Sequence, residues 1–357
     1  MIREYRSILW EDVRDDQELP EITYELSLLR LVAFVRACGQ YDFVHFDRDY
    51  AQSVGARDVF AATPHVLGLF SRLLTDWSGP DADIRTITLN MRTQSCAGDM
   101  LRVTGKVARK YISADGEYLV DIDALNIGHQ HSAQAATATA TLCLPSRAGG
   151  PVRLRSQPPA RHHVELDPAL PDFARELIGT VKPGAPEPAW PLTRDEIHMW
   201  CECLEDWNPL YWDPDFAATS RYGGIVAPPA SLFHGAGSSV RVGLGYMKPE
   251  VTAPAAIKAG LQGLPLLKEL RKVLLNEITP FAVPGCPEIA VAQARSDYFT
   301  SLHPGDTTRT TQEVLNCSPL KRTKLGEGHF LTWVRSVYNQ SDVLVRTFTL
   351  TGFYYHT

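Results

Sequence analysis

Two similar stretches of sequence constrain the fold of this chain more than any other feature. The first covers residues 38–55 and the second covers residues 204–224, at an offset of 166. A later match, between residues 97–99 and residues 304–306, has an offset of 207. The difference of 207 − 166 leaves about 41 additional residues in the second copy. This self-similarity predicts two copies of one structural unit, with an insertion in the second copy.

Composition divides the chain between the two copies. Residues 146–159 are rich in Pro, Gly, Arg and Ser, and residues 182–188 contain three prolines. Proline and glycine interrupt helices and strands. We therefore predict a domain over residues 1–145, a linker over 146–189 and a second domain over 190–357, with its insertion at about 235–284.

Hydrophobic periodicity predicts the same elements in both copies. Residues 64–77 have apolar side chains at helical spacing, and four segments with period-two alternation follow, at 84–92, 101–111, 118–126 and 134–144. The second copy ends with comparable segments at 289–299, 307–314, 329–339 and 343–355. We expect an α+β fold in which an antiparallel sheet wraps a central helix. Pairing of the copies would give one continuous sheet and hide its edges.

The insertion contains leucines near helical spacing, at 264, 267, 270 and 274. This pattern favours an ordinary packed helix. A second interpretation makes the insertion a wall or a cap of an enlarged binding pocket.

Composition excludes several classes of protein. The chain has 357 residues, with 35 Lys+Arg, 41 Asp+Glu and a net charge of −6, which gives no basic footprint for nucleic acid. It has no apolar stretch of the ~18 residues that a membrane span needs. The charged residues among the first 16 do not resemble a secretory signal. Seven scattered cysteines are typical of reduced thiols, so we expect a cytoplasmic protein.

The repeated stretches resemble the sequence motif of the MaoC-like hot-dog family. This family comprises the R-specific enoyl-CoA hydratases and 3-hydroxyacyl-thioester dehydratases. Residues 39–47 match the final His and Asp of the motif, and residues 205–213 match its Asp, Asn, Pro, Leu and final Asp. The first half also resembles the smaller chain of the two-chain hydratases of cholesterol side-chain degradation, and the second half resembles the partner chain. In the first half, the segments that carry this likeness are residues 43–51, 57–60 and 75–80. In the second half, they are residues 223–229, 303–306 and 337–340.

The resemblance implies two tandem hot-dog domains that form a pseudo-dimer. It implies a thioester substrate, on CoA or an acyl carrier, with a bulky acyl group. No separate cofactor is expected, because the CoA is part of the substrate. Sheet edges of this fold could also support a homodimer or a heteromer.

Hydration of an enoyl thioester needs water at the β-carbon and a proton at the α-carbon, and a carboxylate and an imidazole can divide this work. His45 matches the family's catalytic His. Gln40 stands where the family has its Asp, and a glutamine amide can only orient a water. Asp42 could take the lost role, or it could be a turn or capping aspartate.

The second copy keeps Asp206 and Asn208 of the family motif but has Tyr211 in place of the His. The resemblance implies that this copy mainly shapes the acyl pocket, and joint use of His45 with Asp206 is an alternative. The backbone N–H of Thr63, at the predicted start of the central helix, is the expected donor to the thioester oxygen. The alternative is that Thr63 is an ordinary helix N-cap.

In the second copy, Pro228 and Pro229 remove two consecutive N–H groups, which argues against an equivalent oxyanion site there. We expect no metal site either, because His129 and His131 lack further ligands at convincing spacing and His162 and His163 lie in the predicted linker.

The predicted function is hydration of an enoyl-CoA or dehydration of a 3-hydroxyacyl thioester. One alternative is a non-catalytic or partner-dependent subunit that binds an acyl thioester. Another is different hot-dog chemistry, such as thioester hydrolysis or a biosynthetic dehydration.

Overall fold

The computed structural model describes residues 6–155, 168–184, 191–231, 247–278 and 281–356. His162 and His163, and the first part of the predicted insertion up to residue 246, lie outside the described residues. A short 3-10 helix, η1 (Trp10–Asp12), precedes the first strand.

One antiparallel sheet of 11 strands runs through both halves in the order β1-β3-β4-β5-β2-β7-β11-β10-β8-β6, and β9 pairs with β10 beside this path. The first copy contributes β1 (Ile22–Leu26), β2 (Asp83–Met91), β3 (Asp99–Ile112), β4 (Tyr118–His129) and β5 (Ser132–Cys143). The second copy contributes β6 (Val181–Pro183), β7 (Glu288–Tyr298), β8 (Thr308–Cys317), β9 (Lys321–Thr323), β10 (Gly326–Asn339) and β11 (Leu344–His356).

The strands of the two copies are arranged in equivalent order. Read inward from the two ends of the path, the order is β1-β3-β4-β5-β2 in the first copy and β6-β8-β10-β11-β7 in the second. At the centre of the path β2 pairs with β7, from Thr86 opposite Asp297 to Asn90 opposite Gln293. The predicted continuous sheet is therefore confirmed. The path ends on the short strands β1 and β6, and association with a partner at these edges stays a prediction.

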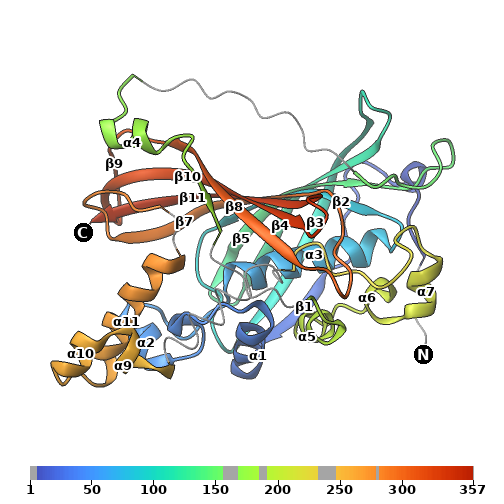
Figure 1. Cartoon of the computed structure of the whole chain (residues 1–357). Coiled ribbons are helices and arrows are strands. Elements are labelled where there is room, and N and C mark those ends of the chain that lie inside the picture. Colours follow the sequence, from blue (N-terminus) through green and yellow to red (C-terminus); the bar gives the residue numbers. More distant parts are fainter. Residues whose placement is uncertain (1–5, 156–167, 185–190, 232–246, 279–280, 357) are drawn as a thin grey trace.

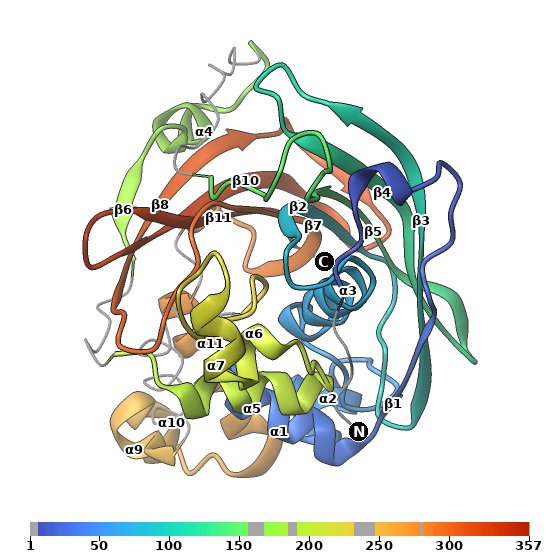
Figure 2. The same cartoon turned by 90° about the vertical axis from the view of Figure 1, so that its right-hand side faces the viewer.

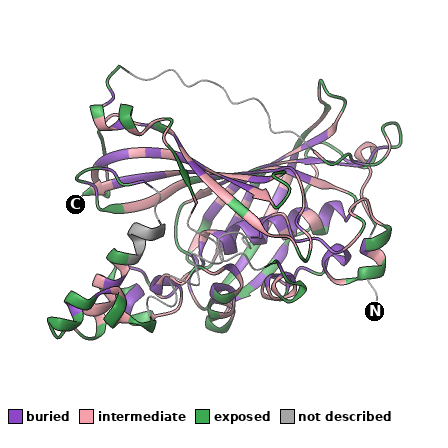
Figure 3. Cartoon of the chain, viewed as in Figure 1, coloured by how far each residue is buried: buried purple, intermediate pink, exposed green. Residues whose placement is uncertain are grey.

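The central helix α3 (Thr63–Ser78) lies inside the curve of the sheet, as Figure 2 shows. Leu69, Phe70 and Leu74 have no exposed surface, which is the expected result of the apolar spacing in this segment. Figure 3 shows the same helix largely in the colour of buried residues. The predicted helix over residues 64–77 is thus confirmed.

The helices before α3 repeat in the second copy. The first set is α1 (Leu28–Cys38), η2 (Phe43–His45) and α2 (Arg48–Ser53). The second set is α5 (Arg194–Leu204), α6 (Pro209–Trp212) and α7 (Pro214–Thr219). Side chains of Ser27 and Thr193, 166 residues apart, cap α1 and α5 at their N-termini.

Helix α5 crosses α3 at Gly68. A Cβ atom at that position would lie 2.5 Å from Cδ1 of Leu204 and 3.3 Å from Cζ2 of Trp200. The absence of a side chain therefore lets the second copy pack directly on the central helix of the first.

Part of the predicted linker belongs to the second domain. Residues 168–184 contain α4 (Asp172–Leu177) and β6, and β6 pairs with β8. A three-residue edge strand has too few residues to show periodicity, so composition alone placed the boundary too late, at residue 190. Earlier in the predicted linker, Val152 is buried against Leu119 and Cys143.

The described part of the insertion forms α9 (Pro249–Thr252), α10 (Pro254–Lys258) and α11 (Gly263–Ile278). The helix predicted from the leucine spacing is therefore confirmed. In Figure 1, α11 lies beside α2, and its Leu264 and Leu267 pack on an apolar cluster of the first copy. That cluster consists of Phe43, Val44 and Tyr50.

The described residues contain neither a candidate membrane span nor a candidate metal cluster. No helix among them is both long and apolar enough to cross a bilayer. No group of three or more His, Cys, Asp or Glu side chains in these parts of the chain is arranged to hold a metal ion.

Candidate active site

His45 ends the 3-10 helix η2 and is only 8% exposed. Its Nδ1 atom lies 2.9 Å from the backbone oxygen of Phe60. A carbonyl oxygen can only accept a hydrogen bond, so Nδ1 carries the hydrogen and Nε2 of the neutral ring has the lone pair. Burial lowers the pKa of His45 below its ordinary value of 6.5, and the charge of Arg271 adds to this effect, whereas Asp42 and the Phe60 hydrogen bond oppose it. This ring can act as a general base.

The segment that holds His45 also leads into α3. Phe60 is three residues before Thr63, the first residue of the helix. Ala62 is the N-cap and makes no capping bond with its side chain, so the alternative of Thr63 as the N-cap is wrong. The first N–H groups of a helix have no partner within it and carry its positive dipole end. The role of the Thr63 N–H as an oxyanion donor stays a prediction.

Asp42 caps the helix that carries His45, and an arginine of the insertion binds it. Its side chain accepts from the backbone N–H of Val44 at 3.5 Å. The Nε atom of Arg271 lies 3.2 Å from each of its carboxylate oxygens, and Nη2 lies 3.1 Å from Oδ2. The interpretation of Asp42 as a capping residue is therefore confirmed. Its use as a replacement general base stays a prediction.

Gln40 is exposed, whereas His45 is buried. It follows Gly39, the left-handed C-cap of α1. No hydrogen bond within the described residues joins the side chains of Gln40 and His45. A water held by its amide therefore also stays a prediction.

The matching residues of the second copy are deeply buried. Asp206 and Tyr211 are each 2% exposed and Asn208 is 3% exposed. Asn208 donates its backbone N–H to Oδ1 of Asp206 at 3.3 Å, and its own side chain caps α6. Burial raises the pKa of Asp206 to about 7; Asp76 adds to this increase, and the Asn208 N–H and Arg72 oppose it. Burial, followed by the charge of Asp206, raises the pKa of Tyr211 well above 10.

The two copies place these groups in different surroundings. The charges that act on Asp206 come from Asp76 and Arg72 of α3, whereas those that act on His45 come from Asp42 and Arg271. No hydrogen bond or ion pair in the described parts of the chain joins His45 to Asp206. Their joint action stays an untested prediction.

Comparisons with known proteins identify the family. A family model described as "FAS1-like, dehydratase domain region" matches residues 182–264. The chain is 34% identical over 89 residues to the 3-oxo-4,17-pregnadiene-20-carboxyl-CoA hydratase beta subunit of Mycobacterium tuberculosis, a match that covers 25% of this chain and 69% of that subunit. The chain belongs to the MaoC-like dehydratase family.

An alpha subunit of another hydratase is matched over less of its own length. The "Probable enoyl-CoA hydratase alpha subunit" of Thermomonospora curvata is 27% identical over 157 residues, which cover 44% of this chain and 43% of that subunit. The chain therefore spans less than half the length of this relative.

Solved MaoC-like structures share the fold over the whole chain. A "putative MaoC domain protein dehydratase" from Chloroflexus aurantiacus has a TM-score of 0.64 at 10% identity, with complete coverage of both chains. A hypothetical protein from Mycobacterium tuberculosis, described as having a double hotdog fold, has a TM-score of 0.58 at 16% identity and covers 98% of each chain. At these identities the likeness establishes the double hot-dog fold alone.

Sequence reasoning about this MaoC-like chain missed a second buried histidine, His65. It lies in the first turn of α3, is 1% exposed and has Nε2 3.0 Å from the Tyr24 hydroxyl. That hydroxyl lies 2.6 Å from the carbonyl of Cys203, so Tyr24 donates to Cys203 and accepts from His65. Burial, with smaller contributions from His45 and Arg30, lowers the pKa of His65 to about 3. A histidine directly after Thr-Pro at a predicted helix start was the available signal.

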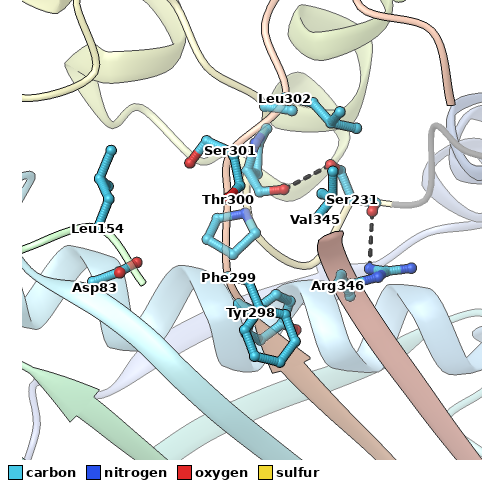
Figure 4. Close-up of a pocket in the computed structure, with 13 residues that line it drawn as sticks. Asp83, Leu154, Ser231, Tyr298, Phe299, Thr300, Ser301, Leu302, Val345 and Arg346 are labelled. Carbon is cyan, nitrogen blue, oxygen red and sulfur yellow. Dashed lines mark hydrogen bonds between the residues drawn. The ribbon is translucent and has the colours of Figure 1, made fainter. Parts of the chain in front are cut away.

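A small cavity lies where the second copy has the counterpart of the α3 start (Figure 4). Its volume of about 40 Å³ is room for a few water molecules rather than an acyl chain. Arg346 lies at its wall and donates from Nη1 to the carbonyl of Ser231 at 3.0 Å. The remaining lining includes Pro228 and Pro229, the pair that argues against an oxyanion site.

Proposed function

We propose that this chain catalyses reversible hydration of an enoyl-CoA at His45. The observation that carries the proposal is the hydrogen bond from Nδ1 of His45 to Phe60. This bond directs a basic Nε2 away from the carbonyl and fixes the ring close to the start of α3. The names of the hydratase relatives support the same reaction class.

In the hydration direction, Nε2 of His45 takes a proton from water as the water oxygen bonds to the β-carbon. The electrons of the C=C bond move toward the thioester oxygen, which accepts a hydrogen bond from the Thr63 N–H. The proton held by His45 is then delivered to the α-carbon, so that atoms and charge balance. Dehydration reverses these steps.

We further propose a bulky acyl group, carried by CoA. Two relatives are named as the beta and alpha subunits of a 3-oxo-4,17-pregnadiene-20-carboxyl-CoA hydratase, a name that denotes a fused-ring acyl group on CoA. The insertion of the second copy packs on the loop that holds His45, and this packing supports an acyl pocket of changed shape in the first copy.

A matched set of variants tests the reaction. The wild type, His45→Ala and the control His131→Ala, which removes a half-exposed imidazole, are incubated with a short, a long-chain and a polycyclic enoyl-CoA. Absorbance of the conjugated thioester reports hydration. We expect turnover by the wild type and the control, fastest with the polycyclic substrate, and a loss of roughly 100-fold or more in His45→Ala. Equal rates in His45→Ala and the wild type would contradict the proposal.

A partner-dependent binding subunit is the second candidate function. The observations in its favour are the exposed Gln40 and the engagement of Asp42 by Arg271, so that no carboxylate among the described residues is hydrogen-bonded to the His45 ring. Tight binding of acyl-CoA with no turnover would support it. Release of free thiol would instead indicate thioester hydrolysis.

A further inference from the structure

The insertion of the second copy holds the loop of His45 by two kinds of contact. Leu264 and Leu267 of α11 pack on the apolar cluster that includes Val44 and Tyr50. One turn further along α11, Arg271 reaches both carboxylate oxygens of Asp42. These side chains are partly shielded from water, with 25% exposure for Arg271 and 19% for Asp42. A fork of this kind fixes orientation as well as charge.

Asp42 transmits this contact to His45 over a short path. Its side chain caps η2, and its backbone oxygen accepts from the N–H of His45 at 3.0 Å. A displacement of Asp42 would therefore move the turn that aims the imidazole. On the neighbouring helix α2, burial raises the pKa of Tyr50, and the charge of Arg271 opposes this rise.

Among the described residues, the titratable groups that interact electrostatically with His45 come from three elements. Asp42 contributes a negative charge from the cap of η2, Arg271 contributes a positive charge from α11, and His65 lies in α3. The first two charges act on the imidazole in opposite directions. Loss of either one would leave the other uncompensated.

We infer that Arg271 is a positioning residue of the active site, which holds Asp42 and, through Asp42, the η2 turn that aims His45. This inference rests on the proposed function, because it assigns Arg271 a role in the His45 reaction. It predicts that a residue of the second copy's insertion controls the catalytic loop of the first copy. It also gives Asp42 a role that does not require it to exchange protons with substrate.

The experiment follows the titration of the His45 ring by NMR, together with kcat and KM for a polycyclic enoyl-CoA. The signal of His45 is identified by its absence from His45→Gln. The variants are Arg271→Gln, Arg271→Lys, Asp42→Asn and the double variant Arg271→Gln/Asp42→Asn. The control is Lys272→Gln, which removes an exposed charge one residue away that pairs with Glu269. Circular dichroism verifies folding of each protein.

We expect Arg271→Gln to raise the titration midpoint of His45, and Asp42→Asn to lower it, since each removes one of two opposed charges. The double variant should titrate between them. Arg271→Lys keeps the charge but loses the fork, so its midpoint should stay near that of the wild type. In Arg271→Gln we expect kcat to fall roughly 10- to 100-fold with a smaller change in KM, because the base is misplaced. Lys272→Gln should behave as the wild type in both measurements.

Midpoints that stay at the wild-type value in both Arg271→Gln and Asp42→Asn, or that move in the same direction, would overturn the role of Arg271. If Arg271→Gln does not fold, the Asp42→Asn titration decides. If the wild type turns over no enoyl-CoA while the midpoints move as expected, the hydratase proposal fails and the control of His45 by Arg271 stands.

Discussion

Replacement of Asp206 by asparagine tests whether the second copy buries a carboxyl group at an energetic cost. In the folded chain, burial and Asp76 raise the pKa of Asp206 from 3.8 to about 7. The folded state therefore binds its proton more tightly than the unfolded state. Stability from this group is fully present below about pH 4 and is lost as the pH rises through about 7. A carboxyl with a raised pKa thus weakens the fold at neutral and alkaline pH.

The size of the effect on stability follows from the rise in the pKa of Asp206 from 3.8 to about 7. At about 1.4 kcal/mol for each unit, ionisation of Asp206 costs about 4 kcal/mol at pH 8 and less than about 1 kcal/mol at pH 4. Asparagine has nearly the shape of the protonated acid, and its side-chain oxygen can still accept from the N–H of Asn208. Asp206→Asn should therefore be more stable than the wild type by up to about 4 kcal/mol at pH 8, and nearly equal to it at pH 4.

Denaturant unfolding at several pH values between 4 and 8 measures this difference, with the same slope of free energy against denaturant required of both proteins. Asp215→Asn is the control, because it removes an exposed carboxylate from the first turn of α7. Asp76→Asn should lower the pKa of Asp206 and recover part of the same stability. An Asp206→Asn variant that is less stable than the wild type at pH 8, or whose difference does not change with pH, would refute this reasoning.

Two further predictions concern the catalytic base and the packing of the two copies. Since burial lowers the pKa of His45 below 6.5, kcat/KM should fall as the pH is lowered, with a midpoint below 6.5. A pH–rate profile with its midpoint above 6.5 would contradict a buried neutral base. Gly68→Ala should destabilise the chain by about 1–3 kcal/mol, because the new methyl group would lie 2.5 Å from Leu204. Gly55→Ala serves as a comparison for backbone strain without a clash, because a Cβ there meets nothing within 4 Å while φ is +89°. Thermal unfolding measures both, and an unchanged Gly68→Ala melting temperature would mean that α5 does not press on α3.

The internal repeat could be predicted because its signals are local. The offset of 166 found in the sequence reappears in backbone hydrogen bonds: Phe60 donates to Val44 in the first copy, and Val226 donates to Leu210 in the second. Helix caps and period-two alternation depend on residues a few positions apart. The helices and strands of one copy can therefore be recognised from its own sequence, without knowledge of the rest of the fold.

The boundary between the copies was harder to predict for a physical reason. Strand β6 has three exposed residues at the sheet edge, so neither burial nor alternation marks it in the sequence. Its place follows only from pairing with β8, more than a hundred residues later in the chain.

The amino-acid sequence by itself determined the two copies, the central helix of the first, the position of His45 and the family. The surroundings of each candidate residue were decided only by tertiary structure. Gln40 and Asp206 occupy matching positions in the repeat, yet Gln40 is exposed and Asp206 is buried. The partner of Asp42 is Arg271, 229 residues away. Burial and charge pairing depend on which distant segments meet, and this information is not contained in any local stretch of the chain.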